Sequence, residues 1–164
     1  MVNPCVLCKA ECCKTYTITI TLFDLARIVR STNKIKLDSF VFLHEPRLLS
    51  YDPDNVFDTT DGYGYYLLGL RSHPCILLNP KTNLCKIHSS APLSCRRYPF
   101  NIQGKLTTRF CPLLPQLLFR LKGPDIKADQ LIREIEEHKK IVKKWNKKPG
   151  TKKQLMKFIM KMAG

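Results

Sequence analysis

The chain has 164 residues, 44% of them hydrophobic, and a formal net charge of +15 at pH 7. This length and apolar content suffice for one globular core and leave little room for a second complete domain. Because the chain has no run of about 18 apolar residues and residues 1–5 offer no basic region followed by a hydrophobic one, we expect neither a transmembrane helix nor a secretory signal. We therefore expect a protein of the reducing cytoplasm.

The first elements are predicted from alternation and helix-start patterns. Residues 16–20 alternate polar and apolar side chains, which predicts a short strand. Thr21 followed by Asp24 is a helix-start pattern, and apolar residues at helical spacing predict an amphipathic helix over residues 22–31.

The next stretch predicts a second helix and then a loop. We expect Asp38 to cap a short helix over residues 39–43, which ends at Pro46. Residues 50–64 are rich in Asp, Gly and Tyr, and this composition is typical of a loop.

The middle of the chain predicts strands and loops. Residues 65–70 and residues 75–78 are apolar runs of strand length, and a turn-rich segment follows the second run. Two strands joined by a tight turn would bring Cys75 close to Cys85. Residues 95–100 contain no glycine and are interrupted by proline, so we expect an ordered loop there rather than the interior of a helix.

The C-terminal part predicts two basic helices. Apolar residues at helical spacing over residues 125–148 predict a long amphipathic helix, broken by Pro149 and Gly150, and residues 152–162 predict a second one. The acidic residues of the first helix are expected to face outward: Glu134, Glu136 and Glu137. No acidic residue follows Glu137, whereas ten lysines lie within residues 139–161.

Such a basic segment indicates an acidic partner. Clustered lysines attract phosphates through counterion release, so RNA, DNA or the ribosome is the partner that we expect. A solvated lysine-rich face without a partner, or a helix that lies on an anionic membrane surface, are the alternatives. The elements together predict an α+β fold: a small irregular cysteine-rich domain over residues 1–120, with short strands and helices, and a basic helical extension over residues 121–164.

The eight cysteines dominate the chemistry of the sequence. In a secreted protein they would indicate disulfides, but in the cytoplasm the same number indicates metal binding or redox chemistry. Disulfides remain an alternative if the source is a hyperthermophile. The cysteines form an early and a late group of four: Cys5, Cys8, Cys12 and Cys13, then Cys75, Cys85, Cys95 and Cys111.

The early group has the spacing C-x2-C-x3-C-C. A C-x2-C turn directs two thiolates at one ion, and further ligands usually come from a distant segment. Thiolates are soft ligands, which favours zinc or iron over magnesium or calcium. Because adjacent side chains diverge, Cys12 and Cys13 rarely reach one ion without strain, so two sites, or one cluster and a spare thiol, both agree with the pattern. We expect Cys5, Cys8 and one of this pair to meet late cysteines at a shared centre.

Histidines and arginines lie beside the late cysteines. His73 and His88 could each replace a thiolate, but we favour two surface histidines next to a ligand loop. Arg96 and Arg97 could neutralise a thiolate site and donate hydrogen bonds to sulfur. The alternative is that one arginine stacks on Tyr98 or Phe100 and the other faces water.

The joint pattern resembles a known family. The early C-x2-C-x3-C-C, then Cys75-x9-Cys85-x-Ile-His, then Pro-x2-Cys95-Arg-x-Tyr-Pro-Phe and finally Cys111 are similar to the YkgJ-type cysteine-cluster family, described as zinc- or iron-chelating proteins. The resemblance spans about residues 5–112 and implies metal binding through all eight cysteines. It differs in having His88 where the family usually has Tyr, and Ala91 where it often has Arg before the proline.

Two classes of function follow. The first is a non-enzymatic metal protein in which zinc or an iron–sulfur cluster, for example 4Fe–4S, holds the fold together. The alternative is an iron–sulfur redox enzyme or a protein related to lysine methylation, since the flagellin lysine N-methylases look like larger relatives with a similar cysteine pattern. Radical S-adenosylmethionine chemistry is disfavoured, because the order of the cysteine gaps is reversed and the chain is too short for the usual barrel.

Overall fold

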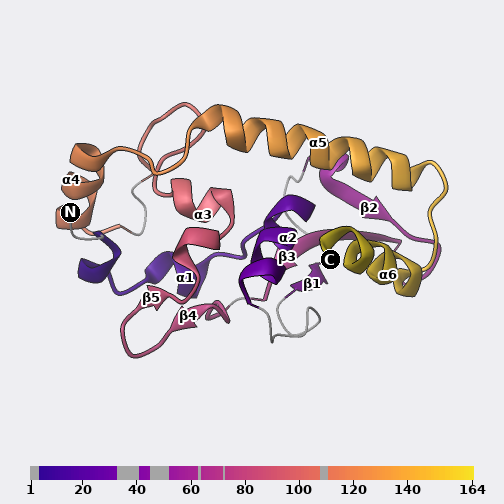
Figure 1. The fold of residues 1–164 in the computed structure, drawn as a ribbon, viewed down its shortest axis with the longest axis horizontal. Coiled ribbons are helices and arrows are strands. Elements are labelled where there is room, and N and C mark those ends of the chain that lie inside the picture. Colours follow the sequence, from indigo (N-terminus) through magenta and orange to yellow (C-terminus); the bar gives the residue numbers. More distant parts are fainter. Residues whose placement is uncertain (1–3, 33–40, 45–51, 63, 72, 108–110) are drawn as a thin grey trace.

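The fold is described from a computed structural model that covers residues 4–32, 41–44, 52–62, 64–71, 73–107 and 111–164 (Figure 1). The helices are α1 (Glu11–Thr15), α2 (Leu22–Ser31), α3 (Leu93–Arg97), α4 (Leu113–Lys122), α5 (Ala128–Asn146) and α6 (Lys152–Ala163). Short 3₁₀ turns lie at Pro4–Leu7 (η1), Pro53–Asn55 (η3) and His88–Ser90 (η4). The strands are β1 (Val41–His44), β2 (Val56–Asp58), β3 (Tyr65–Leu70), β4 (Leu78–Asn79) and β5 (Leu84–Cys85). This is the predicted α+β class.

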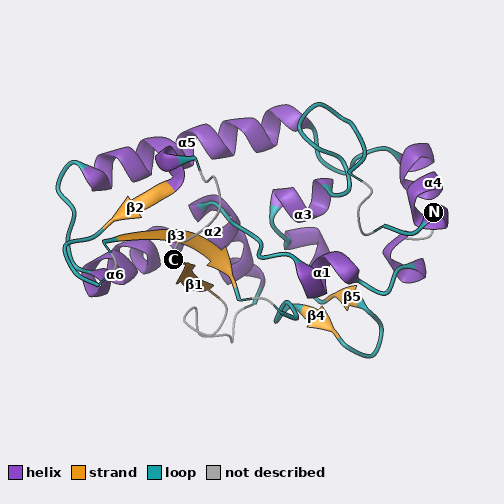
Figure 2. Ribbon diagram, turned by 180° about the vertical axis from the view of Figure 1, so that it is seen from behind, coloured by secondary structure: helices purple, strands orange, loops and turns teal. Residues whose placement is uncertain are grey.

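The strands form two separate antiparallel sheets. A three-stranded sheet has the order β1-β3-β2, with Leu43 opposite Leu68 and Phe57 opposite Tyr66. The β4–β5 hairpin lies apart from this sheet, next to α1 (Figure 2). The helix α5 runs along the long axis and links the end that holds α1, α3, α4 and the hairpin with the end that holds α6 (Figure 1). The molecule therefore has a sheet end and a cysteine-bearing end.

The main core lies between the sheet, α2 and the C-terminal helices. Its fully buried side chains include Leu25 and Ile28 of α2, Leu68 of β3, and Leu155 and Ile159 of α6. The helix α6 packs against α2, and α5 packs against β2. The C-terminal helices thus contribute to the same core as the cysteine-bearing part, while the division at residue 120 stays a prediction.

The strongly patterned helices and the central strand are confirmed. The helix α2 begins at a capping box in which the Thr21 hydroxyl accepts from the Asp24 N–H at 3.1 Å and the Asp24 carboxylate accepts from the Thr21 N–H at 2.9 Å. β3, α5 and α6 lie where the sequence predicts them, and α6 also begins at a capping box, formed by Thr151 and Gln154. None of the described helices is long and apolar enough to cross a membrane.

Four local predictions need correction. The helix expected at residues 39–43 is wrong where the structure describes it, because residues from Val41 onward form β1 and pair with β3; its start lies outside the described residues. Residues 50–64 contain η3 and β2 rather than only loop. Of residues 75–78 only Leu78 lies in a strand, and the first half of the loop expected at residues 95–100 belongs to the helix α3.

The strand predicted at residues 16–20 is an extended segment with a single bridge to β3, between Thr19 and Gly69. The Ile20 N–H donates to the Leu68 carbonyl at 3.1 Å and the Leu70 N–H to the Ile18 carbonyl at 2.8 Å. The chain that leaves the first cysteines is therefore aligned along the central strand.

Candidate metal centre

The cysteines converge on one cavity of about 370 Å³. Seven of them line it: Cys5, Cys8, Cys12, Cys13, Cys75, Cys85 and Cys95. Cys111 does not line it but is buried, within electrostatic range of Cys8 and Cys12. Thiols from both groups, far apart in sequence, thus approach each other at the cysteine-bearing end of the molecule.

Short helical turns position the early cysteines. Cys5 lies in η1, and the Cys8 N–H donates to its carbonyl at 3.1 Å, which closes the C-x2-C turn. Ala10 has a left-handed backbone with φ of 57° and starts α1, which carries Cys12 and Cys13. The four early cysteines, which lie within nine residues of one another, line the same cavity.

Hydrogen bonds join the late cysteines to this segment. The Cys75 N–H donates to the Cys13 carbonyl at 2.8 Å, and the Leu78 N–H donates to the Cys75 carbonyl at 2.9 Å. Leu78 pairs with Cys85 across the hairpin. A hairpin thus holds Cys75 and Cys85 beside the same cavity, although it begins later than the sequence predicts.

Cys95 comes from α3, which is anchored to the main core. The Leu93 N–H in the first turn of α3 donates to the Asp24 carboxylate at 2.9 Å. Asp24 is 2% exposed and also caps α2. The position of Cys95 therefore depends on a buried carboxylate of another helix.

The thiols are shielded from water, which favours their protonated form. Burial raises the pKa of Cys5 and of Cys111 to about 11 and raises the pKa of Cys95 well above its usual value. The vicinal pair behaves differently: the hydrogen bond from the Cys13 thiol lowers the pKa of Cys12 to about 7, and the same contact raises the pKa of Cys13. Their sulfurs lie 3.9 Å apart. A cation that binds here would therefore release protons.

The donor set fits zinc or iron, both of which accept soft thiolates. Within the ranges that the structure describes, no three Cys, His, Asp or Glu side chains lie close enough to share one ion. The thiols line a common cavity and would have to move closer together to bind one ion.

The hydroxyl of Tyr98, a residue that lines the cavity, is buried and has no hydrogen-bond partner among the described residues. A thiolate of a metal-bound cysteine could accept its hydrogen bond.

The basic residues beside the cysteines have different roles. Arg97 is 4% exposed, and its guanidinium donates to the carbonyls of Ile126, Asn101 and Ile102. The expectation that one of the two arginines faces water is therefore wrong for Arg97, whose guanidinium joins α3 to the segment before α5. Arg96 does line the cavity.

Only one of the two histidines beside the late cysteines lines the cavity. His73 is exposed, with Nε2 3.1 Å from the Thr17 hydroxyl, and does not line the cavity. His88 lines the cavity, but its Nε2 lies 3.6 Å from a carboxylate oxygen of Asp125.

Neither a site role for Tyr98 nor the helix α4 is predicted from the sequence. The aromatic hydroxyl three residues after Cys95 is the signal that could have indicated Tyr98. For α4, the signal is proline at its start: Pro112 precedes the helix, and Pro115 lies in its first turn, where a missing N–H costs no intrahelical bond.

A cavity lined by cysteines from distant segments is typical of the cysteine-cluster class of metal-binding proteins. The family model CxxCxxCC, described as "Putative zinc- or iron-chelating domain", matches residues 4–112, about two thirds of the chain, and the protein belongs to this family. This confirms the predicted resemblance. The family name writes two residues between the second and third cysteines, where this chain has three, residues 9–11. No curated protein and no solved structure matches the chain.

Proposed function

We propose that the protein binds zinc or iron in the cytoplasm through Cys5, Cys8, Cys12, Cys13, Cys75, Cys85, Cys95 and Cys111. The convergence of thiols from η1, α1, the hairpin and α3 on one cavity carries this proposal. Soft donors in this number suit zinc or an iron–sulfur cluster. Membership of a chelating family supports it independently.

A bound metal would cross-link very short elements of secondary structure. The helices α1 and α3 have five residues each, and β4 and β5 have two each. Such short elements gain little stability from their own hydrogen bonds, so a metal would contribute folding free energy directly. We therefore propose a structural role for the metal as the first function.

Metal analysis after anaerobic purification tests this proposal. A colourless protein with stoichiometric zinc, or a brown and reducible protein with iron and sulfide, would each support it and would identify the metal. Purified protein without metal that also fails to take up Zn²⁺ or Fe²⁺ under reducing conditions would contradict it.

A double variant, Cys8→Ser with Cys95→Ser, provides a second test. We expect it to lose its metal and to melt at a lower temperature, because it removes ligands from two distant segments. The exposed Ser89 provides a control, and Ser89→Ala should change neither property. Full metal content and an unchanged melting temperature in the double variant would refute the site.

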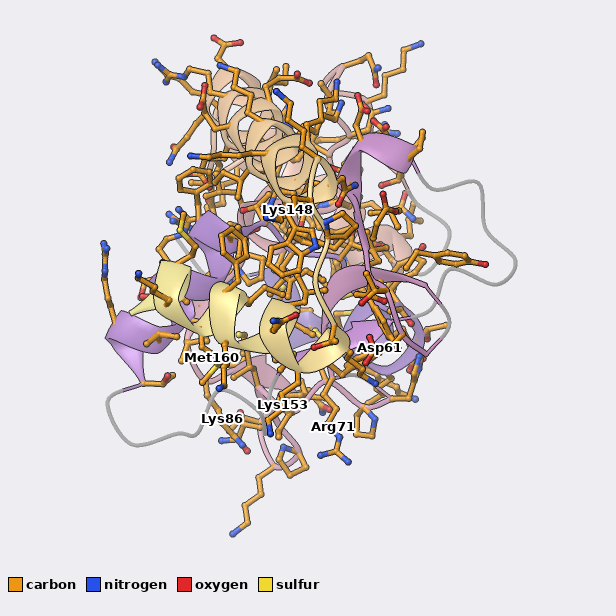
Figure 3. The ribbon with its side chains drawn as sticks, turned by 90° about the vertical axis from the view of Figure 1, so that its right-hand side faces the viewer. Asp61, Arg71, Lys86, Lys148, Lys153 and Met160 are labelled. Atoms are coloured by element: carbon orange, nitrogen blue, oxygen red, sulfur yellow. The ribbon has the colours of Figure 1, made fainter. Side chains whose placement is uncertain are left out.

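The lysines of α5 and α6 support nucleic-acid or ribosome association as a second proposed function. Lys139, Lys140 and Lys143 form ion pairs with acidic residues. Farther along the chain, exposed lysines have no ion pair within the described part of the protein: Lys144, Lys147, Lys148, Lys153, Lys157 and Lys161. Lys148 and Lys153 lie at the end of the molecule where α5 turns into α6 (Figure 3).

Salt-dependent binding of RNA measures this association. Replacing Lys147, Lys148 and Lys153 by Gln should weaken binding to a mixed-sequence RNA and reduce the salt dependence of the association constant. The matched control replaces the exposed Lys81, Lys105 and Lys127 by Gln, with the same change in net charge. Equal losses in both triple variants, or no binding by the wild type, would contradict a specific role for this surface.

A further inference from the structure

A second cavity, of about 290 Å³, is lined by residues of α2, β3 and α5. Among the described residues, it has no cysteine in its lining and shares only Thr19 and Ser94 with the cavity of the candidate metal centre. Thr19 and Ser94 are exposed, so the cavity is open to solvent. Its walls are largely aliphatic: Ile20, Leu67, Ile102, Leu131 and Ile135.

The imidazole of His138 brings a buried hydrogen-bond donor to this cavity. His138 lines the cavity and is 2% exposed. Its Nδ1 accepts the Leu22 N–H at 3.3 Å, so the proton of the neutral ring lies on Nε2. No group in the described part of the chain accepts the Nε2–H. A buried donor without an acceptor costs free energy, and an oxygen atom of a bound molecule would supply the missing acceptor.

The charges beside the cavity favour an uncharged ligand. Burial lowers the pKa of His138 to about 4, so its ring is neutral at pH 7 and does not attract an anion by charge. The Asp24 carboxylate also lines the cavity, and both of its oxygens already accept hydrogen bonds, from the Thr21 N–H and hydroxyl, the Leu93 N–H and the Arg27 guanidinium. A cationic ligand would therefore find no free carboxylate oxygen at Asp24.

The ion pairs of Arg27 also disfavour an anion. The Arg27 guanidinium lies between two carboxylates, those of Asp24 at 2.6 Å and Glu134 at 2.7 Å. One positive and two negative charges leave a net negative charge beside the cavity, which repels an anionic ligand.

We propose that this cavity binds a small uncharged organic molecule whose oxygen accepts the Nε2–H of His138 and whose apolar body packs against the aliphatic walls. Ketones and amides have this chemistry. Water could also accept the hydrogen bond, but it would leave the aliphatic walls hydrated, whereas an organic molecule would bury them. The proposal requires no cysteine and is independent of metal binding.

Cyclohexanone is the probe that tests this proposal, because it combines a carbonyl oxygen with an apolar ring. Added to the full chain labelled with ¹⁵N, it should shift the ring signals of His138 in a saturable manner and slow the exchange of the Nε2–H with water. Methylenecyclohexane has nearly the same shape but lacks the oxygen, and it should bind several-fold more weakly. Cyclohexanecarboxylate and cyclohexylammonium should bind more weakly as well.

Two variants locate the binding, which is followed through the backbone amide signals of the lining residues. His138→Asn removes the Nε2–H, while its amide oxygen can still accept the Leu22 N–H, and it should weaken cyclohexanone binding several-fold. Ile135→Phe fills the cavity without changing the imidazole and should abolish binding. Ile132 is exposed on the same helix and does not line the cavity, so the control Ile132→Phe should bind like the wild type.

Circular dichroism establishes which variants fold. If His138→Asn does not fold, the comparison of cyclohexanone with methylenecyclohexane in the wild type decides the role of the imidazole. Absence of saturable cyclohexanone binding would show that the cavity holds water only, and it would overturn the proposal. Equal affinities of the wild type for these two probes, or undiminished cyclohexanone binding by a folded Ile135→Phe, would overturn it as well.

Discussion

The backbone N–H of Cys75 donates to the carbonyl of Cys13 at 2.8 Å, and this bond joins the early and late cysteines without involving a sulfur atom. The two groups are therefore connected by the fold itself. A metal that binds the thiols would add to this connection rather than create it.

Tyr98→Phe should have opposite effects in the metal-free and the metal-loaded protein. A buried hydroxyl without a partner costs about 1–3 kcal/mol, so its removal should leave the metal-free protein equally stable or slightly more stable. In the loaded protein the hydroxyl can donate to a thiolate sulfur, and its removal should weaken metal retention several-fold. Chelator competition measures the effect on metal retention, and denaturant unfolding measures the effect on the metal-free protein.

The exposed Tyr65 gives the control variant Tyr65→Phe, which should change neither property. If Tyr98→Phe destabilised the metal-free protein and left the metal affinity unchanged, this role of Tyr98 would be contradicted.

Arg97→Ala should lower the free energy of unfolding by about 3 kcal/mol, because it leaves three carbonyls near α3 without their donor. Denaturant unfolding of the variant measures this loss. Arg71 is exposed, and Arg71→Ala should change stability by less than about 0.5 kcal/mol. If the two variants had equal free energies of unfolding, the buried guanidinium of Arg97 would make no contribution to stability.

His138 should make the fold less stable in acid. Burial lowers its pKa from 6.5 to about 4, while Nδ1 accepts the Leu22 N–H at 3.3 Å. Above pH 6.5 the imidazole is neutral in both states and does not change stability. As the pH falls from about 6.5 to about 4, only the unfolded chain takes up the proton, and stability should fall by about 3 kcal/mol in total.

The His138→Asn variant isolates this effect. Its difference in unfolding free energy from the wild type should change over that pH range, whereas the exposed variant His73→Gln should follow the wild type. Parallel curves for His138→Asn and the wild type would exclude His138 as the cause.

Leu155→Ala should destabilise the whole protein by about 3 kcal/mol, since the fully buried Leu155 of α6 packs in the same core as α2 and β3. The exposed Met162 on the same helix provides the control Met162→Ala, which should have little effect. Thermal unfolding measures both variants. A loss below about 1 kcal/mol would favour a C-terminal extension on which the fold of residues 1–120 hardly depends.

The elements that the sequence predicts correctly carry their signals locally. Thr21 and Asp24 specify the start of α2 by a capping box, and the apolar spacing within α5 specifies its buried face without reference to the rest of the chain. The strands β1 and β2 were missed because residues such as Val41 and Val56 become strand only through pairing with β3. One acidic side chain of α5 also differs from its expected outward position, because Glu134 binds Arg27 of α2 at 2.7 Å.

The candidate site, like the fold, could be predicted from the sequence only in its local features. The cysteine spacing and the family resemblance indicate a thiol site, but spacing alone does not say which distant thiols meet. That information lies in long-range contacts, such as η1 with α4 and Cys13 with Cys75. The role of Arg97 could not be predicted either, because its three acceptors are carbonyls that only the fold assembles.

The carboxylate of Asp24 has a consequence beyond the helix that it caps. One of its oxygens serves the start of α2, and the other holds the first turn of α3, two residues before Cys95. The sulfur of Cys95, a proposed metal ligand, is thus positioned by a carboxylate inside the hydrophobic core. A substitution that displaces the start of α2 would therefore also displace Cys95. Damage to the packing of α2 would then lower the affinity of the proposed site for its metal.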